Sequence, residues 1–505
     1  MSHTDDTTLT GGRHPLVEIL AIAAPTVATM LTYTILQFID AIMVSRIQPA
    51  SPVYVTAQGN GGMWAWIAMS FAVGLTGVVN TYVSQYMGKG EPRKGAAYAW
   101  AGNWFSLGFW FLLVPYAFAL PILFERILGH SGETLRLETS YAQICIFGGV
   151  FMMLARSTAQ FFFGLHKASV PLIAACSAIL INIGANWVLI YGNLGAPAMG
   201  VTGAAIGTAL GSLAELLVLL GVFLSPKYAK AFGSRETWRP NWRAIKDILK
   251  LGFPAGAMIV NEMVCWGYFM TALLPRAGAA AGESPDVHNA VGWIALRYMH
   301  LAFMPAVGMS IALTAIVGRF MGMGRPDLAA KRTWLGLGVT MSYMAVCALL
   351  MVLFRDRAVE QFIDEGTDPE IAAQMIALGA RIMIVGAIFQ VFDAMGMAIT
   401  GALRGAGDTL WTGVLFITLS WSIIIGGGHL MIAQFPEMGS LGPWIATAVY
   451  IITLGAALLV RFMGGKWKTI QVVRHAGEPS LTQTLPGEDL TVSPDAMAGV
   501  SPGSP

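Results

Sequence analysis

"QYMGKGEPRKGAAYAW" (residues 85–100) returns 234 residues later as "RFMGMGRPDLAAKRTW" (residues 319–334). Both stretches keep the two glycines of a GxG motif, a proline two residues after it, a double alanine and a final tryptophan. A repeat of this kind changes the prediction of the fold, because each copy then belongs to one of two related structural units.

Three further pairs of segments extend the repeat over most of the chain. They are "EILAIAAP" (18–25) with "DILKLGFP" (247–254), "GLHKASVP" (164–171) with "ALRGAGDT" (402–409), and "GVTGAAIGT" (200–208) with "GSLGPWIAT" (439–447). Their spacings of 229, 238 and 239 residues change slowly, so small insertions are enough to explain them. The chain is therefore predicted to consist of two homologous halves.

The composition predicts a polytopic membrane protein. Of the 505 residues, 55% are hydrophobic and 11% are charged, and the mean hydropathy is +0.63. The charged share of an average soluble domain is about 25%. Each of twelve apolar runs exceeds the roughly 20 residues that cross a bilayer: 16–44, 60–85, 97–124, 138–162, 170–192, 200–224, 246–275, 288–320, 332–355, 372–400, 410–433 and 438–463. The first run is read as a retained helix rather than a signal peptide, and a net charge of +2 does not indicate nucleic-acid binding.

An even number of spans in each half gives both halves the same orientation. The prediction is an all-α integral membrane protein with twelve transmembrane helices in two six-helix bundles, a parallel repeat typical of secondary transporters. Of the 30 Lys and Arg residues, 20 lie on the side of the amino terminus and six on the other. This bias predicts that both termini are cytoplasmic. The predicted parts are an N-terminus (1–15), an N-lobe (16–224), a connecting loop (225–245), a C-lobe (246–465) and a tail (466–505), disordered from about residue 476.

Enzymatic and metal-binding signatures are not found in the sequence. The four cysteines lie inside apolar segments without paired spacing, which favours a packing role (Cys145, Cys176, Cys265 and Cys347). No G-x-x-x-x-G-K-[ST] stretch for ATP and no Ser–His–Asp, HExxH or CxxC pattern occurs. We expect neither a cofactor nor catalysis.

An acid within "ILQFIDAIMV" (residues 35–44) is the first candidate site residue. A charged side chain at the centre of a membrane helix costs about 2.5–3.5 kcal/mol on insertion scales, so Asp40 needs a partner or a function. Asn182 and Asn186 lie four residues apart and share one helical face. Two amides and a carboxylate could coordinate a cation or hold a proton. The alternative is an interfacial acid and asparagines that join helices.

Two further acids, Glu262 and Asp393, lie deep in apolar context and should face a cavity or each other. Such carboxylates could hold a proton or Na⁺ in one state and a cationic substrate in another. Glu215 is interpreted as the partner of a helix cation or as an inner-interface residue, and Arg156, Arg297 and Arg381 as structural. These assignments remain open at the level of sequence.

The chain resembles multidrug and toxic compound extrusion (MATE) transporters of the NorM type over residues 15–465. The resemblance is carried by "APTVATMLTYTILQFIDAIMVSRI", the GxGxP loops at 88–92 and 322–326, "NIGANWVLIYGNLGAPAMGVTGAAIGT", "FPAGAMIVNE" and "DAMGMAITGALRGAGDT". It implies a MATE/MOP-like fold and export of organic, mainly cationic compounds in exchange for Na⁺ or H⁺.

The resemblance also assigns roles to individual residues. It implies cation or proton coupling at Asp40, Asn182, Asn186, Thr208, Glu262 and Asp393, with Na⁺ possible at the last two. The candidate substrate-binding residues are Asp40, Glu262, Asp393, Tyr33 and Gln37. Some relatives have Asp where this chain has Asn186 and Tyr where it has Phe389, so the coupling ion stays open between Na⁺ and H⁺. The implied partners are small organic cations and membrane lipid. The implied state is a monomer in the inner membrane.

Two other functions are weighed against this one. A lipid-linked glycan flippase of the same superfamily should line its cavity with basic residues to bind pyrophosphate, whereas the candidates here are mainly acids. A membrane enzyme lacks a catalytic constellation. The repeat spacing of 229 also places Phe269 opposite Asp40, so the two halves are expected to differ in chemistry.

Overall fold

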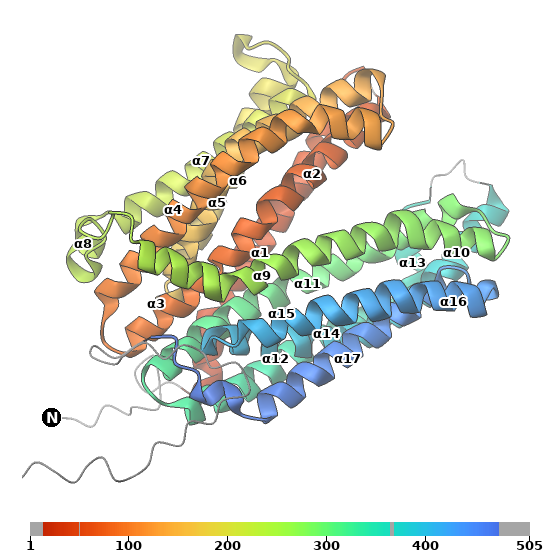
Figure 1. Ribbon diagram of the computed structural model, residues 1–505. Coiled ribbons are helices and arrows are strands. Elements are labelled where there is room, and N and C mark those ends of the chain that lie inside the picture. The colour runs from red at the N-terminus through yellow and green to blue at the C-terminus, as the bar shows by residue number, and fades with distance from the viewer. Residues whose placement is uncertain (1–13, 50, 364–367, 474–505) are drawn as a thin grey trace, which may run out of the picture. The chain divides into compact units, whose positions relative to one another are not determined.

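The computed structural model of the chain describes residues 14–49, 51–363 and 368–473. The sequence predictions for residues 1–13 and for the tail from 474 on fall outside these ranges. Within them the chain is helical and no strand occurs (Figure 1).

The elements are α1 (Pro15–Ser45), α2 (Pro52–Thr76), α3 (Val78–Gly88), α4 (Pro92–Ile122), η1 (Leu123–Ile127), α5 (Gly132–Gly164), α6 (Ser169–Tyr191), η2 (Asn193–Gly195), α7 (Val201–Phe223), α8 (Pro226–Phe232), α9 (Trp242–Tyr268), η3 (Phe269–Leu273), α10 (Leu274–Ala280), α11 (Pro285–Gly322), α12 (Pro326–Leu353), α13 (Arg355–Glu360), α14 (Pro369–Ala406), α15 (Thr409–Leu419), η4 (Ser420–Gly427), α16 (Gly428–Gln434), η5 (Pro436–Met438), α17 (Leu441–Met463) and η6 (Lys466–Thr469).

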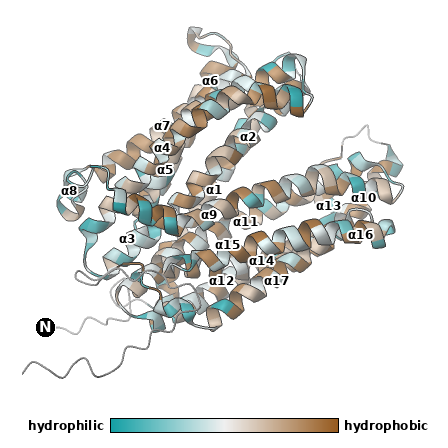
Figure 2. Cartoon of the chain, in the orientation of Figure 1, coloured by the Kyte–Doolittle hydropathy of each residue, from teal (hydrophilic) through white to brown (hydrophobic). Residues whose placement is uncertain are grey.

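Twelve helical segments of the described chain are long and apolar enough to span a membrane, as predicted. Several are composite: α2 continues into α3, α4 into η1, α9 through η3 into α10, and α15 through η4 into α16. Figure 2 shows hydrophobic residues along the helices and hydrophilic ones toward their ends and loops. The protein is therefore a multi-pass membrane protein.

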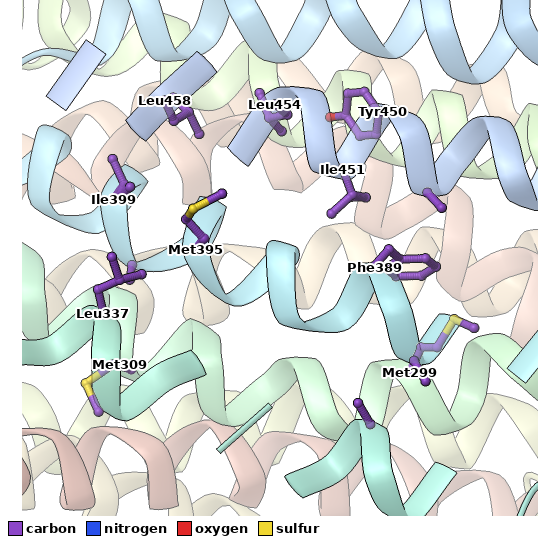
Figure 3. Close-up of a cluster of buried hydrophobic side chains, with 14 of the residues drawn as sticks. Met299, Met309, Leu337, Phe389, Met395, Ile399, Tyr450, Ile451, Leu454 and Leu458 are labelled. Carbon is purple, nitrogen blue, oxygen red and sulfur yellow. The ribbon is translucent and has the colours of Figure 1, made fainter. Parts of the chain in front are cut away.

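The helices form an amino-terminal bundle (α1–α7) and a carboxy-terminal bundle (α9–α17). In the first, α5 packs against α2, α4 and α7, and α6 against α7. In the second, α14 packs against α11, α12 and α17. Figure 3 shows part of the apolar core of the carboxy-terminal bundle, where Tyr450 and Ile451 of α17 lie near Phe389 of α14.

The GxGxP motif that opens the repeat is a helix–turn–helix signal. Gly90 and Gly324 have φ values of +80° and +69°, a left-handed conformation that glycine adopts without a steric cost. Pro92 and Pro326 then occupy the first position of the next helix, where a missing N–H is harmless. The chain closes both turns in the same way. The N–H of Glu91 donates to the Tyr86 carbonyl at 2.9 Å, and that of Arg325 to the Phe320 carbonyl at 2.8 Å.

The first glycine of each motif brings the two bundles together. A Cβ added at Gly88 would collide with the backbone of Arg319 and Gly322, and one added at Gly322 would collide with the backbone of Gln85. Since 85–88 and 319–322 are repeat equivalents, each glycine meets the image of its own segment. This is the contact expected on the axis that relates two parallel repeats.

A second pair of contacts follows the same symmetry. A Cβ at Gly74 would lie 3.0 Å from the Cα of Gly256, and a Cβ at Gly308 would lie 2.6 Å from the Cα of Val27. Gly74 and Gly308 are 234 residues apart, and Val27 and Gly256 are 229 apart, which are the spacings of the repeat. The contact of α2 with α9 is therefore the image of the contact of α1 with α11.

Hydrogen bonds between the bundles gather around α3. Asn80, Thr81 and Gln85 donate to the carbonyls of Ile311 (3.2 Å), Arg404 (2.9 Å) and Gly405 (2.9 Å), respectively. A buried ion pair joins Arg332 of α12 to Glu18 of α1 at 3.1 Å. This end of the molecule, where the GxGxP loops lie, is thereby closed.

The structure corrects one register of the sequence repeat. His166 and Gly407 both have positive φ, and the next N–H in each case donates to a carbonyl five residues back, Lys167 to Phe162 and Asp408 to Leu403, both at 2.8 Å. These helix ends are 241 residues apart, whereas the sequence match gave 238. The match failed because a non-glycine residue holds the left-handed position in the first half.

The connection between the bundles is shorter and more structured than the predicted loop 225–245. It contains α8, and α9 begins at Trp242 rather than at residue 246. Trp100 and Trp104 of α4 donate to carbonyls of this segment, those of Ser234 and Trp238, both at 2.7 Å. The segment is therefore attached to the amino-terminal bundle.

Candidate functional site

Asp40 lies in a polar cluster at the junction of α1, α6 and α7. The Nδ2 of Asn186 donates to Asp40 Oδ1 at 2.6 Å, and the hydroxyl of Thr208 donates to Asp40 Oδ2 at 3.4 Å. The same Nδ2 reaches Asn182 Oδ1 at 3.2 Å. The four side chains predicted to form the amino-terminal site are thus brought together.

The side chains of this cluster are buried, and not all of their polar atoms form hydrogen bonds. Asp40 is 7% exposed, and both asparagines are fully buried. Among the described residues, Asn186 Oδ1 and Asn182 Nδ2 have no hydrogen-bond partner. Buried polar atoms are normally paired, and each exception calls for an explanation such as an unseen ion or water. Asn186 Oδ1, the Asp40 carboxylate and the Thr208 hydroxyl supply oxygen ligands of the kind that a hard cation prefers.

A glycine that the sequence analysis did not single out makes room for this cluster. A Cβ at Gly207 of α7 would collide with Asn186 Oδ1. Gly203, Gly207 and Gly211 recur every four residues, and added side chains at Gly203 and Gly211 would meet the α6 backbone at 2.6 Å and 3.0 Å. Small residues at this spacing let membrane helices approach closely. The G-x-x-x-G-x-x-x-G pattern was the available signal.

Replacing Gly207 by Ala tests this arrangement. We expect the methyl group to push the Asn186 amide away from Asp40 and to remove a charge-assisted hydrogen bond worth about 1.5–3 kcal/mol. Affinity for the coupling cation, measured as the ion concentration at half-maximal transport in proteoliposomes, should fall roughly tenfold or more. Gly221→Ala is the matched control, since no atom lies within 4 Å of a Cβ at that position of the same helix. An unchanged affinity in Gly207→Ala would contradict the assigned contact.

A second polar cluster in the amino-terminal bundle joins residues whose roles the sequence left open. The hydroxyl of Tyr33 (α1) donates to Glu215 Oε1 (α7) at 2.6 Å. The guanidinium carbon of Arg156 (α5) lies 3.3 Å from the centre of the Tyr33 ring, a cation–π contact. Glu215 is 3% exposed, so it is not an interfacial residue. Sequence could not find this group, because its members lie on three different helices.

Gln37 lies between the two clusters on α1. It is exposed, and it is separated from Tyr33 by four residues and from Asp40 by three. Tyr33, Gln37 and Asp40 therefore share one face of the helix.

Glu262 of α9 and Asp393 of α14 face the interior of the carboxy-terminal bundle. The two carboxylates are near enough to interact electrostatically with each other, and both interact electrostatically with the Tyr450 side chain of α17. Each is half-buried, and within the described residues neither forms a hydrogen bond or an ion pair. Their neighbour Asn261 is engaged elsewhere, donating to Ser420 at 2.9 Å and accepting from the Trp421 indole at 2.8 Å.

The carboxy-terminal bundle has aromatic residues where the amino-terminal bundle has its Asp40 cluster. Phe269, the repeat equivalent of Asp40, is fully buried and packs edge-on against Trp444 at 5.1 Å. Phe389 stacks parallel to Trp444 at 6.4 Å; its place in the apolar core is visible in Figure 3. The two halves share a scaffold but differ in the chemistry of this layer.

Comparison with known proteins agrees with this architecture. The MatE family model matches residues 25–188 and 258–426. A protein of Mesorhizobium japonicum named "Probable multidrug resistance protein NorM" is 26% identical over 465 residues, covering 89% of this chain and 94% of the relative. A protein of the same name from Pseudomonas aeruginosa is 26% identical over 463 residues and covers 91% of each chain.

Solved structures with the same fold include an outward-facing multidrug resistance MATE family transporter of the MOP superfamily. It has a TM-score of 0.79 and 19% identity, and the match covers 91% of this chain and 98% of that one. A eukaryotic MATE transporter gives a TM-score of 0.77 at 16% identity, covering 90% and 98%. With a family match over most of its transmembrane region, this chain belongs to the MatE family of transporters.

Proposed function

We propose that this protein is a secondary active multidrug efflux antiporter that exports organic, mainly cationic compounds in exchange for Na⁺ or H⁺. The relatives named multidrug resistance protein NorM support this function. The observation in the structure that carries it is the Glu262/Asp393 pair, two acids in membrane-spanning helices without a bonded partner among the described residues. Intramembrane acids of this kind mark ion and substrate pathways.

The mechanism that fits the geometry is alternating access of the two bundles around their pseudo-two-fold axis. The hydrogen bonds around α3 close the end of the molecule that carries the GxGxP loops. If that end is cytoplasmic, as the Lys and Arg bias predicts, the closed end separates the sites from the cytoplasm. Substrate would then leave outward, and Na⁺ or H⁺ would bind the carboxylates and favour the return.

The coupling and substrate residues are proposed as two sites. Asp40, Asn182, Asn186 and Thr208 form an enclosed oxygen and amide cluster suited to a coupling cation or proton. Glu262 and Asp393 form a more accessible acidic pair that could bind Na⁺ or a substrate cation. No cofactor is part of this proposal. We also propose that the protein is a monomer in lipid of the inner membrane, with both termini cytoplasmic, and that it has no enzymatic activity.

The flippase alternative is not favoured. A pyrophosphate carrier needs several basic groups along its path, whereas Arg156 and Arg297 are the two basic candidates of the sequence and the Arg156 guanidinium already stacks on the Tyr33 ring.

Transport of a fluorescent organic cation into proteoliposomes, with Na⁺ and proton gradients imposed separately, tests the function. We expect Asp393→Asn and Glu262→Gln each to lower gradient-driven transport at least about tenfold, because each removes a charge that attracts the cation. Glu370→Gln, an exposed position on the same helix as Asp393, is the control and should transport normally. Absence of cation transport by the wild-type protein under either gradient would reject the proposal.

A further inference from the structure

The segment that connects the two bundles carries a strong excess of positive charge. Residues 225–250 include seven Lys and Arg residues and two acids. Both acids are engaged elsewhere: Glu236 pairs with Arg93 at 3.8 Å, and the Asp247 carboxylate accepts a hydrogen bond from the Tyr98 hydroxyl at 2.8 Å. Four exposed cations, which form no ion pair within the described residues, make up a basic cluster: Arg239, Arg243, Lys246 and Lys250.

A cavity of about 480 Å³ lies where this segment meets α4. Its lining includes Ala97 of α4 and the side chains of Arg239 and Arg243. Ligand pockets typically have volumes of about 300–1,000 Å³. The side chain of Asn241 already accepts hydrogen bonds from the first N–H groups of α9 at 3.1 and 3.2 Å, so an anion here would meet the guanidiniums rather than the helix end. Two guanidiniums can bind one phosphate group through charge-assisted hydrogen bonds.

The cavity lies near the end of a membrane span. Ala97 is five residues after Pro92, where the membrane-spanning α4 begins, which places it about 7.5 Å along the helix. Trp242, which lines the cavity, is 72% exposed, and Trp238 is 50% exposed. Tryptophan is enriched where the hydrocarbon of a bilayer meets its headgroups. A molecule in this cavity would therefore lie at the depth of lipid headgroups.

An exposed face of α9 continues from the cavity into the membrane. Trp242, Lys246, Leu249 and Phe253 follow one another at spacings of four, three and four residues, so they share one face of the helix. Phe253 is 58% exposed. Over about 16 Å this face changes from aromatic and cationic to apolar. A phospholipid has the same order of groups, from its phosphate to its acyl chains.

The scaffold that the two halves share does not require the basic cluster. At the spacing of 229, which relates the first helices of the two bundles, the equivalents of Lys246 and Lys250 are Val17 and Ala21. Val17 is 49% exposed on α1 without a charge. The cations are therefore a property of the second half alone.

We propose that this cavity binds an anionic phospholipid, with its phosphate on the Arg239 and Arg243 guanidiniums and an acyl chain along Leu249 and Phe253. Clusters of cations at the end of a membrane span attract anionic lipids. A lipid bound here contacts both bundles, because Ala97 belongs to α4 and Arg243 to α9.

The test measures binding of dansyl-labelled phosphatidylglycerol to the purified full-length protein in detergent, by energy transfer from the protein's tryptophans. Unlabelled phosphatidylglycerol, phosphatidylcholine and glycerol phosphate serve as competitors. We expect phosphatidylglycerol to compete at least about tenfold better than the other two. The choline group of phosphatidylcholine neutralises its phosphate, and glycerol phosphate has no acyl chain.

Two double variants locate the binding site. Arg239→Gln with Arg243→Gln should weaken phosphatidylglycerol binding roughly tenfold or more, because both phosphate ligands are lost. Lys227→Gln with Lys230→Gln is the matched control. These lysines are exposed on α8 of the same segment and do not line the cavity, so the control removes the same charge elsewhere. Its affinity should stay close to that of the wild type.

Each other outcome would overturn the proposal. Wild-type affinity in the arginine variant would show that the cavity does not bind the lipid. Equal losses in the arginine and lysine variants would show that only the net charge matters. If glycerol phosphate competes as well as phosphatidylglycerol, the cavity binds a soluble phosphate ester and the lipid is not its ligand. Since binding is measured without transport, failure of the efflux function would leave these results unchanged.

Discussion

Replacing Asp40 by Asn is expected to abolish ion-coupled efflux while the protein remains inserted in the membrane. Asparagine has nearly the same size as aspartate and can keep a contact with Thr208, so the packing of α1, α6 and α7 should survive. It loses the charge that a coupling cation or proton must neutralise. A charge moving through a potential of 100 mV is worth about 2.3 kcal/mol, so gradient-driven accumulation should drop on the order of 50-fold.

The measurement compares accumulation of an organic cation in vesicles containing equal amounts of wild-type and variant protein. Ser45→Ala is a suitable control on the same helix, because Ser45 is exposed and bonds only to the Ile42 carbonyl of its own helix. Normal accumulation by Asp40→Asn would show that the buried acid has no part in coupling.

Replacing Gly322 by Ala is expected to open the closed end of the molecule. The added Cβ would collide with the backbone of Gln85, which cannot move aside as a flexible side chain could. Overpacking of this kind costs typically 1–3 kcal/mol. If the cost falls only on the closed state, its population relative to the open state should fall roughly tenfold or more. Gly88→Ala should act in the same way, since the two contacts are images of each other.

The rate at which a maleimide labels a buried cysteine measures this opening. Ser84 is fully buried beside Gly318, so Ser84→Cys should react slowly with a maleimide, in a background without the four native cysteines. Gly322→Ala should speed the reaction. Gly338→Ala, where a Cβ meets no atom within 4 Å, should not. If the rate is the same in all three proteins, the glycine contact does not control closure.

Much of the fold could be predicted from local sequence. The twelve spans follow from runs of apolar residues, because the cost of placing polar groups in hydrocarbon depends on the length and composition of each run. The repeat was visible because its glycines and prolines have positional roles that few other residues fill: Gly90 and Gly324 need positive φ, and Pro92 and Pro326 start helices. At the end of α5 the position with positive φ is held by His166 rather than by a glycine, and there the repeat spacing read from the sequence was wrong by three residues.

The acids of the candidate site were also predictable one at a time. Asp40, Glu262 and Asp393 stand out because an isolated carboxylate in an apolar helix is expensive. The spacing of Asn182 and Asn186 identified one face of α6, and the structure puts that face against Asp40.

What sequence alone determined, then, was each property that depends on a single helix: its span, its turn signals and the charges that it carries. Tertiary structure alone decided which helices meet. It brought Tyr33, Arg156 and Glu215 together from α1, α5 and α7, and it put Phe269 against Trp444 where the other half has Asp40. The physical reason is that these contacts join segments more than 100 residues apart, and the periodicity within one helix specifies its face but not its partner.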